Sequence, residues 1–128
     1  MLLVAANAAE RAEITRALRI EFPQARIEAV TDMDHFDAVE DFDDFALAVT
    51  AWDLSWAEGI EIVGTIKSLD PDCPVLVVAN GDEPHDSTVE RDAMTAGADR
   101  CLCLSDAPAL RAAAREMARG AVQASVPM

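Results

Sequence analysis

Six side chains that could bind a cation follow the apolar stretches of the sequence. Each carries a carboxylate, amide or hydroxyl oxygen, and oxygen is the ligand atom that Mg²⁺ and Ca²⁺ prefer. The apolar stretches read as strands, so we expect the six to gather at one edge of a sheet. Their spacing matches no recognisable ligand pattern, and we predict no specific metal site. The six are Asn7, Asp53, Asn80, Asp82, Glu83 and Ser105.

Asp53 is an alternative acceptor for a transferred group, but neither a metal-binding acid pair nor a lysine would assist it. It follows Ala51, the last residue of the apolar stretch FALAVTA (45–51), by two positions. If the strand continued, the two side chains would share a face. As a loop residue, Asp53 would instead be a solvated carboxylate or a favourable charge at the start of the next helix. Trp52 and Trp56 flank it, and we expect both to pack half-buried in the loop rather than to bind a ligand.

The cysteines and histidines offer no convincing site. Cys101 and Cys103 alternate along an apolar stretch, which places them on one strand face, but two further metal ligands are missing. Buried cysteine usually behaves as a small hydrophobe, so we predict core packing for both and for Cys73. The odd total of three cysteines argues against a disulfide framework. We expect His35 and His85 at the surface.

Five apolar stretches alternate with five segments of helical periodicity. A strand–helix alternation predicts a parallel sheet covered on both faces, and right-handed crossovers favour the strand order 2-1-3-4-5. The predicted fold class is therefore α/β, a flavodoxin-like three-layer sandwich with five parallel strands and five helices. The predicted strands are 1–5, 26–30, 45–51, 75–79 and 100–104, and the helices are 8–22, 32–41, 57–69, 87–96 and one that begins after Ser105 or Asp106.

Helical spacing also predicts which side chains each helix buries, and Asp32 is a good N-cap for the second helix. In such a fold, function gathers at the carboxyl ends of the strands, around the switch point between the first and third. The expected buried sets are Ile14, Leu18 and Phe22; Ile60, Val63 and Ile66; Val89 and Ala93; and Leu110, Ala113, Ala114 and Met117.

Composition bounds the class of protein. The chain has 128 residues, of which 52% are hydrophobic and 27% charged, as in one globular domain. We expect this domain to span 1–120 and the residues 121–128 to be a tail or the start of a linker. No apolar run is long enough for a membrane span, and the first residues lack the basic region of a signal peptide. These features predict a cytoplasmic protein.

Charge excludes two classes of partner. The chain carries 24 acidic residues, a single lysine (Lys67) and a formal net charge of −14. Such a surface repels nucleic acid and anionic membranes. An acid-rich, lysine-poor composition is also typical of proteins from salt-loading, halophilic cells, where ions screen the self-repulsion.

Three landmarks in order resemble a receiver domain of the response-regulator family. They are Trp52 followed by Glu58-Gly59-Ile60, the stretch CPVLVVA (73–79), and TAGADRCLCL (95–104). The resemblance covers residue 2 to about residue 120. It implies the same flavodoxin-like fold and a role in two-component or phosphorelay signalling.

The resemblance also implies where the family's phosphoryl chemistry would lie, and those positions carry no chemical group. The Mg²⁺-binding acids after the first strand correspond to Ala5 and Ala6, and the phosphoryl-accepting aspartate corresponds to Ala51. The hydroxyl residue after the fourth strand corresponds to Ala79, and the lysine after the fifth to Leu104. Phosphoryl transfer depends on a metal and on cationic side chains, so we expect a degenerate, non-phosphorylatable receiver.

The predicted function is that of a pseudo-receiver, a protein–protein interaction module without enzymatic activity or cofactor. One alternative is a small-molecule sensor that uses the apolar site, which a pocket of roughly 300 Å³ or more would favour. Another is an active receiver whose chemistry is displaced to Asp53. We further expect the chain to be a piece of a longer regulator, or to form a homodimer.

Charge is distributed unevenly along the chain. Residues 30–99 hold 18 acids against Lys67 and Arg91, a net of −16, whereas the two flanks hold 6 acids against 8 arginines, a net of +2. We therefore predict a partner surface on the first and last helices, for an acidic partner, a second copy or a following helix. The alternative is local pairing with Glu10, Glu13 and Glu116. The arginines of the predicted surface are Arg11, Arg16, Arg19, Arg111, Arg115 and Arg119.

Overall fold

Five parallel strands and five helices make up the described part of the chain. The computed structural model describes residues 1–5, 8–39, 45, 47–52, 54, 58–79, 87–103 and 107–118. The strands are β1 (Leu2–Val4), β2 (Glu28–Val30), β3 (Ala48–Ala51), β4 (Val75–Ala79) and β5 (Arg100–Cys103), in the sheet order β2-β1-β3-β4-β5. The helices are α1 (Ala8–Glu21), α2 (Met33–Asp37), α3 (Gly59–Leu69), α4 (Ser87–Ala96) and α5 (Ala107–Met117). The predicted fold class and strand order are confirmed.

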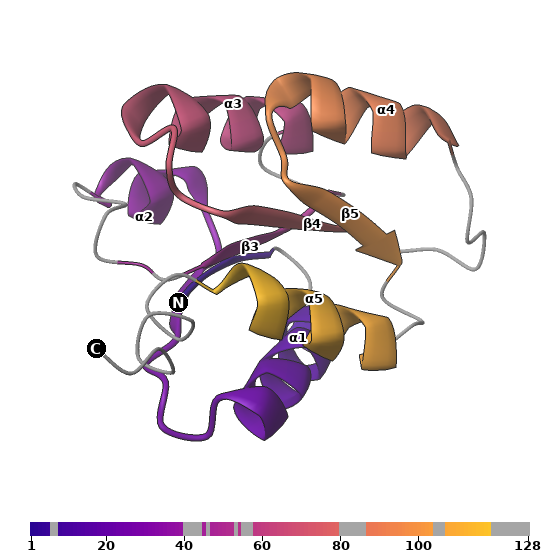
Figure 1. Ribbon diagram of the computed structural model, residues 1–128. Helices are drawn as coiled ribbons and strands as arrows, with labels where there is room; N and C mark the ends of the chain where they lie inside the picture. Colours follow the sequence, from indigo (N-terminus) through magenta and orange to yellow (C-terminus); the bar gives the residue numbers. More distant parts are fainter. Residues whose placement is uncertain are drawn as a thin grey trace, which may run out of the picture.

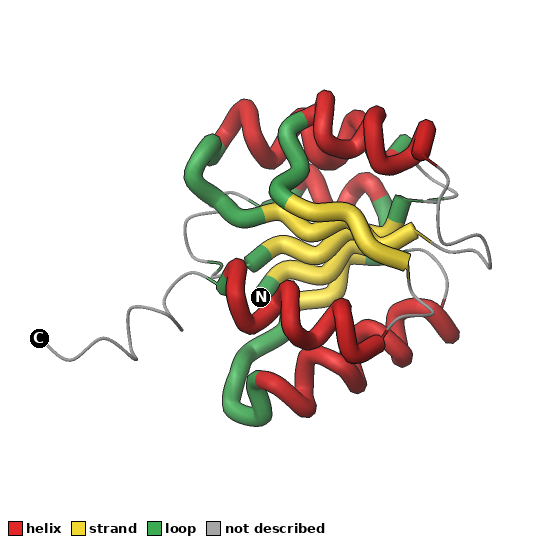
Figure 2. Tube along the Cα trace, turned by 45° about the vertical axis from the view of Figure 1, so that its right-hand side comes forward, coloured by secondary structure: helices red, strands yellow, loops and turns green. Residues whose placement is uncertain are grey.

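The sheet is the middle layer of three. Helices α1 and α5 cover one face, and α2, α3 and α4 cover the other (Figures 1 and 2). Alternation along the strands supplies both interfaces: Leu2 and Val4 belong to the core under α2–α4, whereas Leu3 belongs to the core under α1 and α5. None of the described helices is long and apolar enough to cross a membrane.

The second helix is shorter than predicted. Its N-cap is Asp32, as expected, and the side chain of Asp32 accepts a hydrogen bond from the backbone N–H of His35 at 2.7 Å. The helix ends at Asp37 rather than near residue 41, because the N–H groups of Ala38 and Val39 donate to carbonyls three residues back, which tightens the last turn. Residues 40–44 lie outside the described part.

One predicted core residue of α3 is wrong. Ile60 is 38% exposed, and Ile62 is buried together with Val63 and Ile66. At 100° per residue, Ile60 lies about 120° from Ile66 around the helix, so it falls at the rim of the buried face. The other predicted faces hold where they are described: Ile14, Leu18, Ala93, Leu110, Ala113 and Ala114 are buried, and Phe22 and Met117 pack partly buried.

The cysteines belong to the core, as predicted, where the structure describes them. Cys73 is fully buried, and Cys101 packs partly buried against the same cluster. The side chains of Cys103 and Val89 lie outside the described part.

Lys67 joins three elements at the amino edge of the sheet. Its ammonium group, at the end of α3, donates to the carbonyl of Cys73 at 2.7 Å and to the carboxylate of Asp99 at 2.8 Å. The same Asp99 oxygen accepts from the backbone N–H of Val75, the first residue of β4, at 2.9 Å. Asp99 immediately precedes β5, so this network ties α3, β4 and β5 together.

Candidate functional site

Three of the alanines predicted at the site meet at the carboxyl edge of the sheet. Ala5 directly follows β1, and Ala51 and Ala79 are the last residues of β3 and β4. The register pairs Val4 with Thr50, which places Ala5 beside Ala51 on adjacent strands. These residues therefore lie at the switch point, where α/β sheets of this kind carry their functional groups.

The side chains at this point are chemically inert. Ala5 and Ala51 are each 0% exposed, and Ala79 is partly exposed. A methyl group accepts no phosphoryl group and binds no Mg²⁺. The neighbouring Thr50 is fully buried, and its hydroxyl donates to the carbonyl of Ala51 at 3.1 Å. Across the described ranges, no group of three or more His, Cys, Asp or Glu side chains could hold a metal ion.

Trp52 serves as packing at the mouth of this edge, as predicted. Its ring is partly buried against the core under α2–α4. Gly59, the first residue of α3, lies directly against it, since a Cβ at this glycine would come within 2.7 Å of Trp52 Cε3 and 2.8 Å of its carbonyl oxygen. The close approach of this helix to the loop requires glycine. This close contact also explains why the second residue of the Glu58-Gly59 landmark is a glycine.

Of the candidate oxygen ligands and the two histidines, the structure describes one residue. This is His35, which is exposed on α2, as expected. The remaining predicted positions around this edge lie outside the described part of the chain: Ala6, Asn7, Asp53, Trp56, Asn80, Asp82, Glu83, His85, Leu104 and Ser105.

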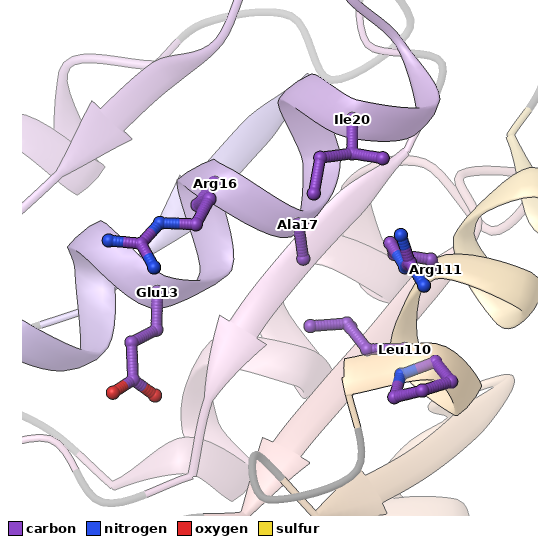
Figure 3. A pocket seen from close by; sticks show the side chains of 7 residues that line it. Glu13, Arg16, Ala17, Ile20, Leu110 and Arg111 are labelled. Atoms are coloured by element: carbon purple, nitrogen blue, oxygen red, sulfur yellow. The ribbon is translucent and has the colours of Figure 1, made fainter.

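The predicted arginine surface lies over α1 and α5, which pack side by side on one face of the sheet (Figure 2). Two grooves flank α1. One, of about 440 Å³, separates α1 from α5; the other, of about 460 Å³, separates α1 from β2. Arg16 lines both grooves, Arg11 and Arg19 line the second, and Arg111 lines the first (Figure 3). Arg119 lies outside the described part.

The described ion pairs on this face join α5 to other elements. Glu116 pairs with Arg100 of β5, at 2.6 Å, and not with an arginine of its own helix. Arg115 approaches Glu21, at the end of α1, to 3.7 Å. Arg19 donates to the carbonyl of Ala25 at 2.7 Å.

Residues distant in sequence form these contacts, so helical spacing did not reveal them. Among the described residues, Arg11, Arg16 and Arg111 take part in no ion pair. Glu10 is buried in the first turn of α1.

Comparison with known proteins shows similarity in structure but not in sequence. No family model matches the sequence, and no curated protein matches it significantly. Among solved structures, a CheY-like response regulator receiver domain protein from Methanospirillum hungatei superposes with a TM-score of 0.72 at 20% identity, over 90% of this chain and 89% of that one. The receiver domain of NtrX from Brucella abortus gives 0.74 at 19% identity, over 91% and 97%.

A third structure, the receiver domain of DrrB activated by BeF3, gives a TM-score of 0.71 at 19% identity, over 91% of this chain and 93% of that one. In a longer NtrX structure from Brucella abortus, the matched region is 25% of that chain. The chain therefore has the fold of response regulator receiver domains, and in at least one structure this fold is part of a longer chain.

Proposed function

We propose that this chain is a pseudo-receiver, a receiver-like domain that acts in signal transduction by binding other proteins and not by accepting a phosphoryl group. The receiver fold suggests the signalling role. One observation carries the finer proposal: the last residue of β3, where the resemblance implies the phosphoryl acceptor, is Ala51, and its side chain is a fully buried methyl group.

The neighbours of Ala51 support the same proposal. Activation of a phosphodonor needs a metal held by carboxylates and a cation that stabilises the transferring group. At the adjacent strand ends the chain has Ala5 and Ala79. A domain without this chemistry transmits information through the proteins that it contacts, so we propose a non-enzymatic, cofactor-independent interaction module. We further propose that it works as part of a longer regulator.

Intact-mass measurement tests the absence of phosphorylation. The chain is incubated with a small-molecule phosphodonor and Mg²⁺ and then weighed, beside an Ala51→Asp variant and an Asp53→Asn variant. We expect no gain of a phosphoryl group by the natural chain, because no carboxylate ends β3. A stoichiometric gain that disappears in Asp53→Asn would overturn the proposal and would assign displaced chemistry to Asp53.

A further inference from the structure

We infer that the groove between α1 and α5 docks an acidic amphipathic helix of a partner protein. This inference rests on the proposed function as an interaction module and names the chemistry of the partner. The groove has a volume of about 440 Å³, and Figure 3 shows Leu110 of α5 extending toward Ala17 of α1 across it. The residues that line it are Glu13, Arg16, Ala17, Ile20, Pro108, Leu110 and Arg111.

The groove offers apolar contact area. Ile20 on its rim is 57% exposed, and Ala17 and Leu110 form an apolar floor. The other large exposed hydrophobic side chains of the described part, Ile60, Leu69 and Met94, belong to α3 and α4 on the opposite face of the sheet. An aliphatic side chain of a partner helix would cover Ile20, in the manner of a helix docked in an apolar groove.

The charged side chains at the groove favour a partner with negative charge. Two other acids of α1 and α5 are paired, Glu21 with Arg115 and Glu116 with Arg100. Arg16 and Arg111 have no ion pair within the described residues, and only Glu13 offers a negative charge in the lining. Guanidinium groups bind carboxylates through paired N–H donors. Arg16 and Arg111, which we call the uncommitted arginines because they have no ion pair within the described residues, therefore suit an acidic ligand.

Arg111 is the most specific of these groups. Its Nε atom is buried and has no hydrogen-bond partner in the part of the chain that the structure describes, while the side chain as a whole is partly exposed at the groove. A charge with part of its solvation already lost attracts an opposite charge more strongly than a fully solvated one. We therefore expect Arg111 to contribute more to docking than Arg16, which is exposed.

Other occupants fit less well. A second copy would bring the same uncommitted arginines face to face, which like charges disfavour. Nucleic acid is repelled by the net charge of −14. An acidic partner helix lies away from the described acids of α2, α3 and α4, because these helices are on the far side of the sheet. Each layer of the fold between the groove and the far side is about 10 Å thick, and the Debye length at physiological salt is about 8 Å. Salt therefore screens the far-side charges at the groove.

A fluorescent model peptide tests the inference. The probe is a 16-residue helical peptide of Ala, Leu and Glu, with leucines along one face and glutamates beside them, and the control peptide has Lys in place of every Glu. In fluorescence anisotropy at 0.15 M KCl, we expect saturable binding of the Glu peptide and none of the Lys peptide. Arg111→Gln should weaken binding about tenfold and Arg16→Gln about threefold, as expected for lost charge-assisted bonds.

Arg91→Gln is the matched control, because Arg91 is exposed on α4, on the opposite face of the sheet. It should bind the Glu peptide as the natural chain does, and circular dichroism checks that every variant is folded. Failure of the Glu peptide to bind would overturn the inference, as would equal weakening by Arg91→Gln and Arg111→Gln. So would a dimer, seen in sedimentation, that Ile20→Asn dissociates, because it would assign the groove to a second copy. None of these results bears on phosphorylation, so a failed docking inference and a failed proposed function remain distinguishable.

Discussion

At the scale of single residues, two glycines show how the position of a glycine decides the effect of replacing it with alanine. Gly64 lies inside α3, and a Cβ there would meet nothing within 4 Å. Gly97 follows α4 with a φ of 117°, and a Cβ there would lie 3.0 Å from Cγ of Lys67. The first glycine therefore only costs helix propensity, whereas the second allows a backbone conformation that L side chains rarely adopt.

We predict opposite effects for the two alanine substitutions. Gly64→Ala should stabilise the fold by about 1 kcal/mol, because alanine is the better helix former. Gly97→Ala should destabilise it by about 1–2 kcal/mol, because a non-glycine residue is strained at positive φ. Urea unfolding of both variants measures the two changes. Equal signs of the two stability changes would show that the backbone at Gly97 is not held at positive φ.

At the scale of elements, the two edges of the sheet have different roles. At the carboxyl edge, Ala5 and Ala51 close the strand ends with buried methyl groups. At the amino edge, Lys67 and Asp99 connect α3, β4 and β5 through an ion pair of 2.8 Å and three bonds to the backbone. The only lysine of the chain thus has a structural role, and it lies at the amino edge, far from the strand ends where receiver chemistry is expected.

We predict that Lys67→Met destabilises the fold by about 1–2 kcal/mol. The methionine keeps the apolar stem but removes the donor to Cys73 and to Asp99, and hydrogen bonds to charged groups contribute about this much. The value is at the low end for a buried pair, because the Asp99 side chain is 46% exposed and therefore screened. Denaturant unfolding measures it, with exposed Arg91→Met as the control. If the free energy of unfolding falls no more in Lys67→Met than in the control, the network acts only as a solvated surface contact.

At the scale of the whole molecule, charge is divided unevenly between the middle segment of the chain and its two flanks. The segment 30–99, which supplies α2, α3 and α4, has a net charge of −16, whereas the flanks that supply α1 and α5 have +2. Repulsion among acids is therefore concentrated in the segment 30–99 of the chain. On the face that α1 and α5 cover, Arg11, Arg16 and Arg111 take part in no ion pair with another described residue.

We predict that stability against urea rises with KCl from 0.1 M into the molar range. The Debye length falls to about 3 Å at 1 M, which screens the repulsion among the acids. Salt also weakens ion pairs, but the described residues form three of these, and they are few against the many repulsions. The double variant Asp37→Asn/Asp72→Asn, at two exposed positions of the acidic segment, should be more stable at low salt and respond less to KCl. A flat response of the natural chain would contradict the salt-adaptation hypothesis.

The sequence by itself determined the alternation of strands and helices, the strand order and the nature of the residues at the strand ends. Apolar periodicity reports which backbone conformation buries a continuous face, and this is a local property. The handedness of crossovers then leaves few ways to order five parallel strands. Ala51 could be assigned to the end of β3 for the same reason, because the apolar stretch of a buried strand stops where the strand ends. Ile60 was misplaced because a rim position and a buried one differ by a modest rotation around the helix.

Only the tertiary structure decided which charges meet. Arg100 lies 16 residues from Glu116 and Lys67 lies 32 residues from Asp99, and both pairs close through the packing of helices on the sheet. Ion pairs depend on distances of a few ångströms between elements, and no local pattern encodes such distances. For the same reason the sequence could not predict that Arg16 and Arg111 have no ion pair with another described residue, since this depends on which acids the packing brings within reach.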